Sequence, residues 1–546
     1  MEPLKGLSME LPLLLSMINE HGAVAHRTTE VVSRDLAGRI HRLTFQQMNR
    51  RTKQLANALT RRGFGLGSRI ATLAWNTHRH MELFYGFTGI GTAIHTVNPR
   101  LTTEHLTYII NDAGGEALFF DADMLPQVEE IAPLLTRIRH YVVLEAPEDM
   151  PQSSLALESY EAWLAAEPET FDWPSFDERT ASTICYTSGT TGRPKGVVYS
   201  HRSTFLQTMT LANLGWLPVP RRNPLVLMPL APMFHSNAWN YPFGAFYMGK
   251  KLVLPGRDLT PRAVQELIVQ ERVTNMALVP SIASNLLEWV EANGLSLDPL
   301  ETMITSGAGM APALLRRLRD GYGIEASHTW GMTECMFGSS GAITARDAAR
   351  PEDDQIPYRC MDGRQTPGMV MEIFDDEGNV LPHDGKARGH LRVKGLWATR
   401  SYLNQPEGSA VDERGWLITG DIATIDEDGY LRLVDRDKDL IKSGGEWISS
   451  ADIEKLACAH PDVVLAAVIG VQHPKWQERP ILLVQRREGS SVTAEDILDA
   501  VRPHVAKWWV PDAVVFVDRF PLTGTNKIRK PDLRAEYGDY LVNQGR

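Results

Sequence analysis

The stretch that decides the fold is Tyr186–Gly196, which reads YTSGTTGRPKG and follows the apolar residues 181–185. An apolar run of this kind predicts a strand, and open α/β sheets bind their ligands where strands end. Glycines let backbone N–H groups approach phosphate oxygens, hydroxyls add short donors, and a lysine adds a point charge. We therefore predict that this phosphate loop binds phosphate through Thr187, Ser188, Gly189, Thr190, Thr191, Gly192 and Lys195.

The phosphate loop differs from a Walker A motif. That motif needs a lysine followed by Ser or Thr, whereas Lys195 is followed by Gly196. The spacing therefore argues against a P-loop kinase or ATPase. Composition alone is equally compatible with a flexible surface turn, so the rest of the chain has to decide between the two interpretations.

On both sides of the loop, apolar runs alternate with amphipathic ones. An amphipathic helix is predicted from about residue 43 to a glycine cluster at 63, 65 and 67, which reads as a helix end and turn. The alternation predicts an α/β fold with largely parallel, layered sheets. Further strands are predicted at 70–75, 225–230, 251–254, 275–279 and 302–305, and further helices at 261–271, 282–292 and 312–321.

After about residue 435 the pattern of apolar residues changes. Short alternating strands at 464–471 and 480–484 mix with helices at 450–458 and 494–501, which predicts a small separate α+β domain. The charged stretch 435–439, DRDKD, is the expected joint between the two parts.

Composition narrows the class of protein. The 546 residues are too many for one compact core, and the net charge of −11 gives no support to nucleic-acid binding. The four cysteines form no C-x-x-C pair, and no apolar run approaches the roughly 18 residues of a membrane span. The apolar patch at 11–17 reads as the start of a helix and not as a signal peptide, so we expect a cytoplasmic protein without integral membrane contact.

Several further motifs follow the phosphate loop in order: PMFHSNAW at 232–239, SGAG at 306–309, SHTWGMTE at 327–334, GD at 420–421, DRDK at 435–438, KSGGEW at 442–447 and TGTNK at 523–527. Together with YTSGTTGRPKG they resemble the adenylate-forming superfamily over nearly the whole chain. That group comprises acyl- and aryl-CoA ligases, firefly-type luciferases and the adenylation domains of peptide synthetases.

The resemblance implies a nucleotide site in the large part of the chain. Glu334 matches the family's magnesium carboxylate, with Thr190 as a second expected ligand, and Thr333 is expected to hydrogen-bond the α-phosphate. Trp330 replaces a commoner tyrosine and could stack on adenine. Asp421 and Arg436 match the ribose-binding pair. The remaining expected nucleotide residues are Gly307, Ala308, Gly309, His328, Thr329, Gly331 and Met332.

The acyl group is expected in a pocket beside this site. His235 occupies the family position that gates the channel between the carboxylate and the thiol of coenzyme A. Trp239 could shorten an acyl tunnel by filling it, and Gly307 and Gly331 are expected to line the same pocket. Without the neighbouring motifs, a histidine or tryptophan among aromatic residues is more often part of a core.

The small domain is expected to move between two reactions. The resemblance implies a large domain at 1–435, a hinge at 436–438 with Lys438 as pivot, and a mobile domain at 439–546. Lys527 matches the lysine of adenylation, and Lys442 matches a lysine of the thioester-forming pose. The expected path of coenzyme A runs along Ser443, Gly444, Gly445, Glu446 and Trp447.

The sequence therefore predicts an ATP-dependent acid–CoA ligase that uses Mg²⁺ and coenzyme A, with a homodimer as an option. The motifs favour short- to medium-chain or methylthio-substituted fatty acids such as 3-methylmercaptopropionate. Three alternatives stay open: a long-chain fatty-acid ligase, an enzyme that loads a carrier protein, and a luciferase-type oxidation. A non-enzymatic relative should have lost Lys527, Glu334 or the phosphate loop, and all three are present.

Overall fold

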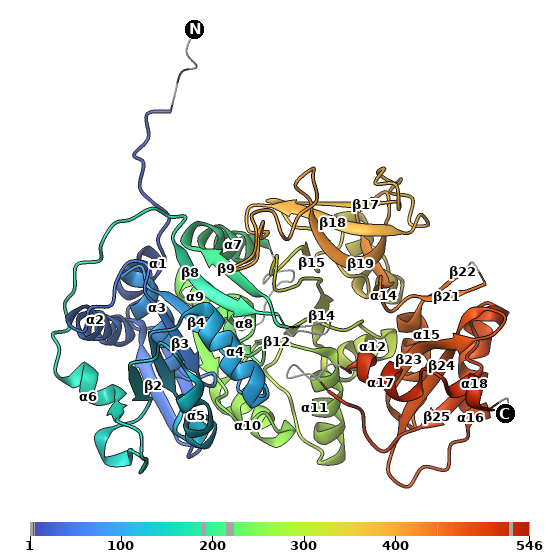
Figure 1. The fold of residues 1–546 in the computed structure, drawn as a ribbon, viewed down its shortest axis with the longest axis horizontal. Coiled ribbons are helices and arrows are strands. Elements are labelled where there is room, and N and C mark those ends of the chain that lie inside the picture. The colour runs from blue at the N-terminus through green and yellow to red at the C-terminus, as the bar shows by residue number, and fades with distance from the viewer. Residues whose placement is uncertain are drawn as a thin grey trace.

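A computed structural model describes residues 4, 6–187, 193–214, 223–444, 446–522 and 528–544. Within these residues the fold is layered α/β, as predicted, with two seven-stranded sheets in the first two thirds of the chain (Figure 1). No helix in the described part of the chain is both long and apolar enough to cross a membrane.

The first sheet carries the phosphate loop. Its strands run parallel except for the last, which turns back antiparallel at the edge. In spatial order they are β7 (Leu157–Ser159), β6 (His140–Val143), β5 (Ala117–Phe120), β3 (Arg69–Leu73), β4 (Ala93–Thr96), β8 (Ala181–Tyr186) and β9 (Gly196–Ser200).

The second sheet carries the motifs at 232–239, 306–309 and 327–334, which lie at or just beyond the ends of parallel strands. Here too one edge strand, β2, is antiparallel. In spatial order the strands are β14 (Glu325–His328), β13 (Thr302–Thr305), β12 (Asn275–Leu278), β10 (Val226–Pro229), β11 (Lys251–Leu254), β1 (Glu30–Arg34) and β2 (Ile40–Thr44). The predicted strands at 225–230, 251–254, 275–279 and 302–305 are thereby confirmed.

Helices flank both sheets. The glycine cluster ends a helix as predicted, because α2 stops at Arg61, Gly63 and Gly67 have positive φ, and β3 begins at Arg69. The helices in this part are α1 (Leu15–Ala25), α2 (Phe45–Arg61), α3 (His78–Gly89), α4 (Thr103–Ala113), α5 (Leu125–Ile131), α6 (Tyr160–Ala165), α7 (His201–Leu214), α8 (Ser236–Trp239), α9 (Tyr241–Met248), α10 (Pro261–Glu271), α11 (Pro280–Ala292) and α12 (Pro312–Tyr322).

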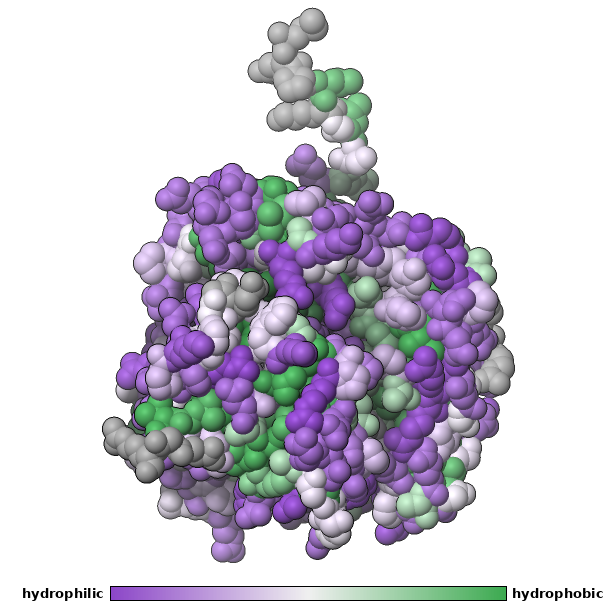
Figure 2. Space-filling model, turned by 90° about the vertical axis from the view of Figure 1, so that its right-hand side faces the viewer, coloured by the Kyte–Doolittle hydropathy of each residue, from purple (hydrophilic) through white to green (hydrophobic). Residues whose placement is uncertain are grey.

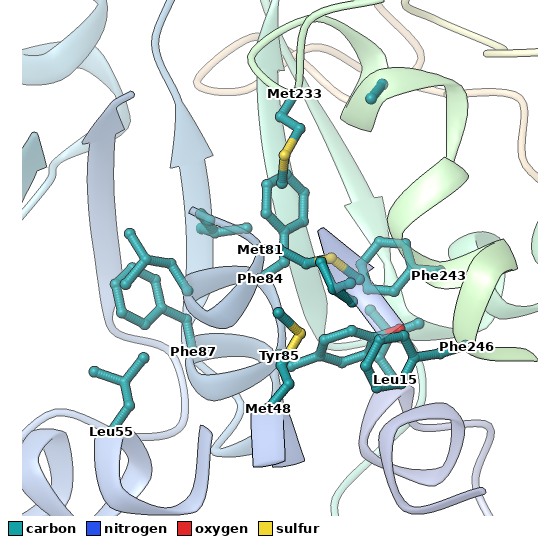
Figure 3. Packing of buried hydrophobic residues seen from close by; sticks show 14 of the residues in the cluster. Leu15, Met48, Leu55, Met81, Phe84, Tyr85, Phe87, Met233, Phe243 and Phe246 are labelled. Carbon is teal, nitrogen blue, oxygen red and sulfur yellow. The ribbon is translucent and has the colours of Figure 1, made fainter. Parts of the chain in front are cut away.

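One core joins the start of the chain to the segment after the 232–239 motif. Phe45 of α2 stacks on Phe246 of α9 with ring centroids 3.8 Å apart, and Tyr85 of α3 donates a hydrogen bond to the Pro242 carbonyl at 3.1 Å. Figure 3 shows Tyr85 of α3 and Phe246 of α9 in one cluster with buried methionines and leucines from α1, α2 and α3. Burial of several large apolar side chains, each worth about 1.5–3 kcal/mol, fixes the position of α9 and of the turn before it.

A smaller antiparallel sheet follows and ends at the predicted hinge. Its order is β17 (Met369–Phe374), β18 (Gly389–Gly395), β19 (Leu417–Ile425) and β20 (Leu431–Arg436). It is preceded by the short pair β15 (Ser339–Ser340) and β16 (Arg364–Gln365), and by α13 (Ala345–Ala348) and α14 (Glu352–Arg359).

The last hundred residues form one mixed α+β layer, which Figure 1 shows in red beside the rest. Its strands β23 and β24 are eleven and ten residues long, so the prediction of short strands here was wrong. The strands are β21 (Ile441–Ser443), β22 (Glu446–Ile448), β23 (Val463–His473), β24 (Gln477–Arg486) and β25 (Ala513–Phe516), and the helices are α15 (Ser450–Ala457), α16 (Ala494–Val501), α17 (Lys530–Tyr537) and α18 (Tyr540–Gln544).

Candidate active site

The phosphate loop is closed at its base by two hydrogen bonds. Thr187 N–H donates to the Lys195 carbonyl at 3.0 Å, and Lys195 N–H donates to Thr187 Oγ1 at 3.1 Å. These bonds continue the pairing of β8 with β9, so both ends of the loop are fixed to the edge of the first sheet. Ser188, Gly189, Thr190, Thr191 and Gly192 lie outside the described residues.

The loop lysine lies close to the expected magnesium carboxylate. The Lys195 ammonium is 4.6 Å from the centroid of the Tyr402 ring, and Tyr402 donates its hydroxyl to Glu334 Oε1 at 2.9 Å. Burial raises the pKa of Glu334, while the Tyr402 hydrogen bond and the charges of Arg436 and Lys195 act in the opposite direction. Tyr402, which the sequence did not single out, therefore contacts both Lys195 and Glu334, two residues expected from distant motifs.

The segment 328–334 continues from β14 and is held from several sides. Thr329 N–H donates to the Thr305 carbonyl at 2.9 Å, and the Thr333 carbonyl accepts the Tyr199 hydroxyl at 2.6 Å. His328 is buried between Thr305 and Asp362, with ring nitrogens 3.0 Å and 3.3 Å from their oxygens. The segment is thus fixed to the end of β13 and, through Tyr199, to β9 of the sheet that carries the phosphate loop.

Gly331 is required by a close backbone approach. A Cβ at this position would lie 1.7 Å from the carbonyl oxygen of Met336, so any other residue would have to move the chain. Gly307, Ala308 and Gly309 follow β13 on the same edge of the sheet and are exposed, and Gly307 has a φ of +87°. This edge therefore keeps an open face beside the buried segment 328–334, of which Met332 is partly buried.

The expected ribose pair is formed, with one further partner. Asp421 of β19 is buried and pairs with Arg436 of β20, with Nε 2.7 Å from Oδ1. The indole N–H of Trp330 donates to Asp421 Oδ2 at 2.9 Å. Trp330 is itself buried. It holds Asp421 in place, a role that is separate from the expected stacking on adenine. The sequence could not indicate this contact because the two residues are 91 positions apart.

Replacing Asp421 with asparagine should therefore weaken ATP binding. The change removes the charge that pairs with Arg436 and with it a charge-assisted acceptor worth about 1.5–3 kcal/mol. We expect the KM for ATP in carboxylate-dependent pyrophosphate exchange to rise by about tenfold or more. Asp376→Asn, at an exposed carboxylate after β17, is the matched control. An unchanged KM for ATP in Asp421→Asn would contradict the ribose assignment.

The segment after β10 has an unusual backbone. Five consecutive non-glycine residues, 236–240, have φ between +46° and +60°, a left-handed conformation that L-residues rarely adopt. Asn237 anchors this turn by donating to Thr183 Oγ1 of β8 at 3.1 Å. Strain of this kind persists only where the surroundings fix it and clusters at functional sites. The turn contains Trp239 and directly follows His235; both are partly buried, and Trp239 packs edge-on against Phe337 with centroids 6.0 Å apart.

A buried amide pair lies next to this turn. Asn240 Nδ2 donates to Gln207 Oε1, and both side chains are fully buried. Asn240 Oδ1 and Gln207 Nε2 have no hydrogen-bond partner among the residues that the structure describes. Neither residue carried a motif that could have drawn attention to it.

The expected coenzyme A face lies on an exposed hairpin. Figure 1 shows β21 and β22 at the outer edge, well away from β14. Lys442 stacks its ammonium on Trp447, 4.4 Å from the ring centroid, and Ser443 Oγ accepts from Arg479 at 3.2 Å. Gly444 has a φ of +61°, and a Cβ there would lie 2.7 Å from the Trp476 ring. Gly445, the side chain of Glu446 and Lys527 lie outside the described residues.

Comparisons with known proteins agree with these motifs. Residues 19–403 match the model of a family described as AMP-binding enzyme, and residues 452–527 match the AMP-binding enzyme C-terminal domain. The chain is 43% identical over 542 residues to 3-methylmercaptopropionyl-CoA ligase of Ruegeria lacuscaerulensis, covering 98% of this chain and 99% of the relative. It is 39% identical to the medium-chain-fatty-acid–CoA ligase of Ectopseudomonas oleovorans, covering 98% of both chains.

The fold is shared with solved structures of low sequence identity. The crystal structure of the anthranilate CoA ligase AuaEII in complex with anthranoyl-AMP superposes with a TM-score of 0.85 at 24% identity. The match covers 98% of this chain and 99% of that one, so both parts of the present fold have counterparts there.

Proposed function

The chain belongs to the AMP-binding enzyme family, and we propose that it is an ATP-dependent acid–CoA ligase that works through an acyl-adenylate. The resemblance to the adenylate-forming superfamily is confirmed. One observation carries the proposal: Lys195 of the phosphate loop lies 4.6 Å from the Tyr402 ring, whose hydroxyl donates to Glu334 at 2.9 Å. Trp330, in the same segment as Glu334, donates to Asp421, which pairs with Arg436. The residues expected to hold phosphate, magnesium and ribose are therefore connected through direct contacts, which supports a single nucleotide site.

The first reaction activates the acid. A carboxylate oxygen attacks the α-phosphorus of ATP, the bond to the bridging oxygen breaks, and pyrophosphate leaves with the electron pair. Negative charge builds on the α-phosphate oxygens, so fixed donors there lower the barrier. We assign these donors to the phosphate loop and Lys527, with the ribose held by Asp421 and Arg436.

Glu334 fits a hard cation. Its carboxylate is buried, is oriented by Tyr402, and offers the oxygen ligands that Mg²⁺ prefers. Bound Mg²⁺ would neutralise charge on the phosphates of ATP. Thr190 is proposed as a second ligand from the sequence alone.

The second reaction forms the thioester. The thiol sulfur of coenzyme A attacks the adenylate carbonyl, the bond from that carbon to the phosphate oxygen breaks, and AMP leaves while the thiol proton passes to solvent. AMP is a good leaving group, so no covalent enzyme intermediate is needed. The hairpin of Lys442, Ser443, Gly444 and Trp447 is far from β14 in this structure. We therefore propose that 439–546 turns about 436–438, with Lys438 as pivot, relative to 1–435.

The acid is proposed to be a short- to medium-chain or methylthio-substituted fatty acid, such as 3-methylmercaptopropionate. The full-length similarity to ligases of 3-methylmercaptopropionate and medium-chain acids supports this class, as does Trp239 within the strained turn. A panel of acids from short to long chains plus 3-methylmercaptopropionate, with ATP and coenzyme A, tests it by AMP release. A preference for long chains would favour the long-chain alternative, and turnover that ignores coenzyme A would favour carrier loading.

The N-terminal arm supports a homodimer as part of the proposal. Leu4, Leu7, Met9 and Leu11 are between 66% and 97% exposed, and Figure 2 shows the arm standing away from the surface with hydrophobic residues along it. A second copy of the chain would cover them. We expect light scattering to give the mass of two chains, and deletion of residues 4–11 to give one; a mass unaffected by the deletion would contradict the arm's role.

A cytoplasmic location belongs to the same proposal and rests on the irregular cysteine spacing. All four cysteines are free thiols, and Cys185 and Cys335 are buried. Cell fractionation is the direct check, and recovery of the protein outside the cytoplasmic fraction would contradict it.

A further inference from the structure

A largely buried lysine, Lys530, lies three positions after Lys527. Lys530 begins α17, and its ammonium is 2.6 Å from Ser450 Oγ and 2.7 Å from Glu454 Oε1. Its side chain is only 13% exposed. The backbone just before it is fixed as well, because Leu522 and Ile528 form a β-bridge and Arg529 N–H donates to the Pro521 carbonyl at 2.8 Å. The described residues on either side of 523–527 are therefore paired with each other.

Ser450 connects this lysine to the other side of the hinge. Its backbone N–H and its hydroxyl each donate to Asp435 Oδ2 at 2.6 Å, and Ala451 N–H donates to the same oxygen at 3.2 Å. Asp435 lies on β20, immediately before the predicted hinge, and it caps the N-terminus of α15 beyond the hinge. Contacts between Asp435 and Ser450 thus span residues 436–438.

The same stretch leads directly to the nucleotide site. Arg436, next to Asp435, holds Asp421 in the ribose pair. A continuous series of contacts therefore runs from Asp421 through the hinge strand to Ser450 and then to Lys530. Such a series couples two sites only if its arrangement changes with the state of the protein.

A purely structural role, in which these contacts only hold the small domain together, is the simpler explanation. Glu454 also accepts from Val468 N–H at 2.7 Å, and Arg534 of α17 pairs with Asp439 at 2.6 Å, so part of the network only joins elements of the small domain. Holding the small domain together does not require Asp435, because Asp435 precedes the hinge. Burying charged groups is costly unless every one is paired, so a network that crosses the hinge favours one domain orientation over others.

We propose that Lys530 is a positioning residue for adenylation: through Ser450 and Asp435 it fixes the start of α17, three residues after Lys527, to the hinge strand in the domain orientation seen here. The inference rests on the proposed function. In this orientation the Lys442 hairpin is far from β14, so the network favours the first reaction and not the second.

The test separates the two reactions. Pyrophosphate exchange with acid and ATP reports adenylation, and acyl-CoA formation from supplied acyl-adenylate reports the second step. For Lys530→Gln we expect exchange to fall by about 10²-fold, the order of loss that misplacement of a reacting group causes, with the second step within about threefold. Ser450→Ala removes the link to Lys530 but keeps the Lys530–Glu454 pair, and it should lower exchange alone by about tenfold. Lys530→Arg, which keeps the charge, should restore most of the activity.

Arg529→Gln is the control, since Arg529 is an exposed neighbour whose side chain pairs with Asp532 at the surface, and the change keeps its backbone N–H. Equal loss of both reactions in Lys530→Gln and Ser450→Ala, or no loss in either, would overturn the inference and leave only the structural role of these contacts. If the unaltered protein showed no exchange with any acid, the proposed function would fail and the inference with it. If the unaltered protein catalysed exchange and the variants did so equally well, the inference would fail but the proposed function would stand.

Discussion

Lys527→Ala is expected to lower carboxylate-dependent pyrophosphate exchange by about 10³-fold, the loss that removal of one well-placed donor to a developing charge can cause. The reason is the charge that builds on the α-phosphate as pyrophosphate leaves. Acyl-CoA formation from supplied acyl-adenylate should be spared, because that step begins after pyrophosphate has left, when charge no longer builds on the α-phosphate.

Lys507→Ala provides the control for this change, because Lys507 is an exposed lysine of the same domain. It should leave both reactions unchanged. Retained exchange in Lys527→Ala would show that the adenylation lysine has been assigned to the wrong residue, whatever the fate of the second reaction.

Lys442→Ala is expected to do the opposite. Adenylate formation should persist, whereas the thioester-forming step should slow by about 10²-fold, since Lys442 is assigned only to the second orientation. Its ammonium now stacks on Trp447 on an exposed hairpin, so its loss removes little from the present structure. Rapid mixing of preformed acyl-adenylate with coenzyme A measures the step directly. Equal losses in both reactions would show that the two half-reactions have been placed wrongly.

The fold was largely predictable because its strands are short apolar runs buried in parallel sheets. Such runs at 251–254 and 302–305 coincide with β11 and β13 to the residue. The prediction of short strands near residue 464 was wrong because β23 extends to His473, where polar residues pair through their backbone with β24. Backbone pairing leaves no apolar signal, so alternation of side chains underestimates a long hairpin.

The candidate site was predictable only where motifs carried it. Asp421 and Arg436 were expected as a pair and lie opposite each other on β19 and β20. Trp330 as a donor to Asp421, and Tyr402 between Lys195 and Glu334, depend on contacts across long stretches of chain. The left-handed turn at 236–240 contains no glycine, and only Asn237 and Asn240 are residue types that favour this conformation, so the sequence indicates it weakly.

The central claim is one enzyme that carries out two reactions, and the most direct measurement follows AMP and acyl-CoA together in one assay with acid, ATP and coenzyme A. The account predicts that both products appear in equal amounts, that omission of any one of the three substrates stops AMP release beyond a single turnover, and that pyrophosphate is the other product. Formation of ADP and phosphate, or sustained AMP release with acid but without coenzyme A, would contradict it.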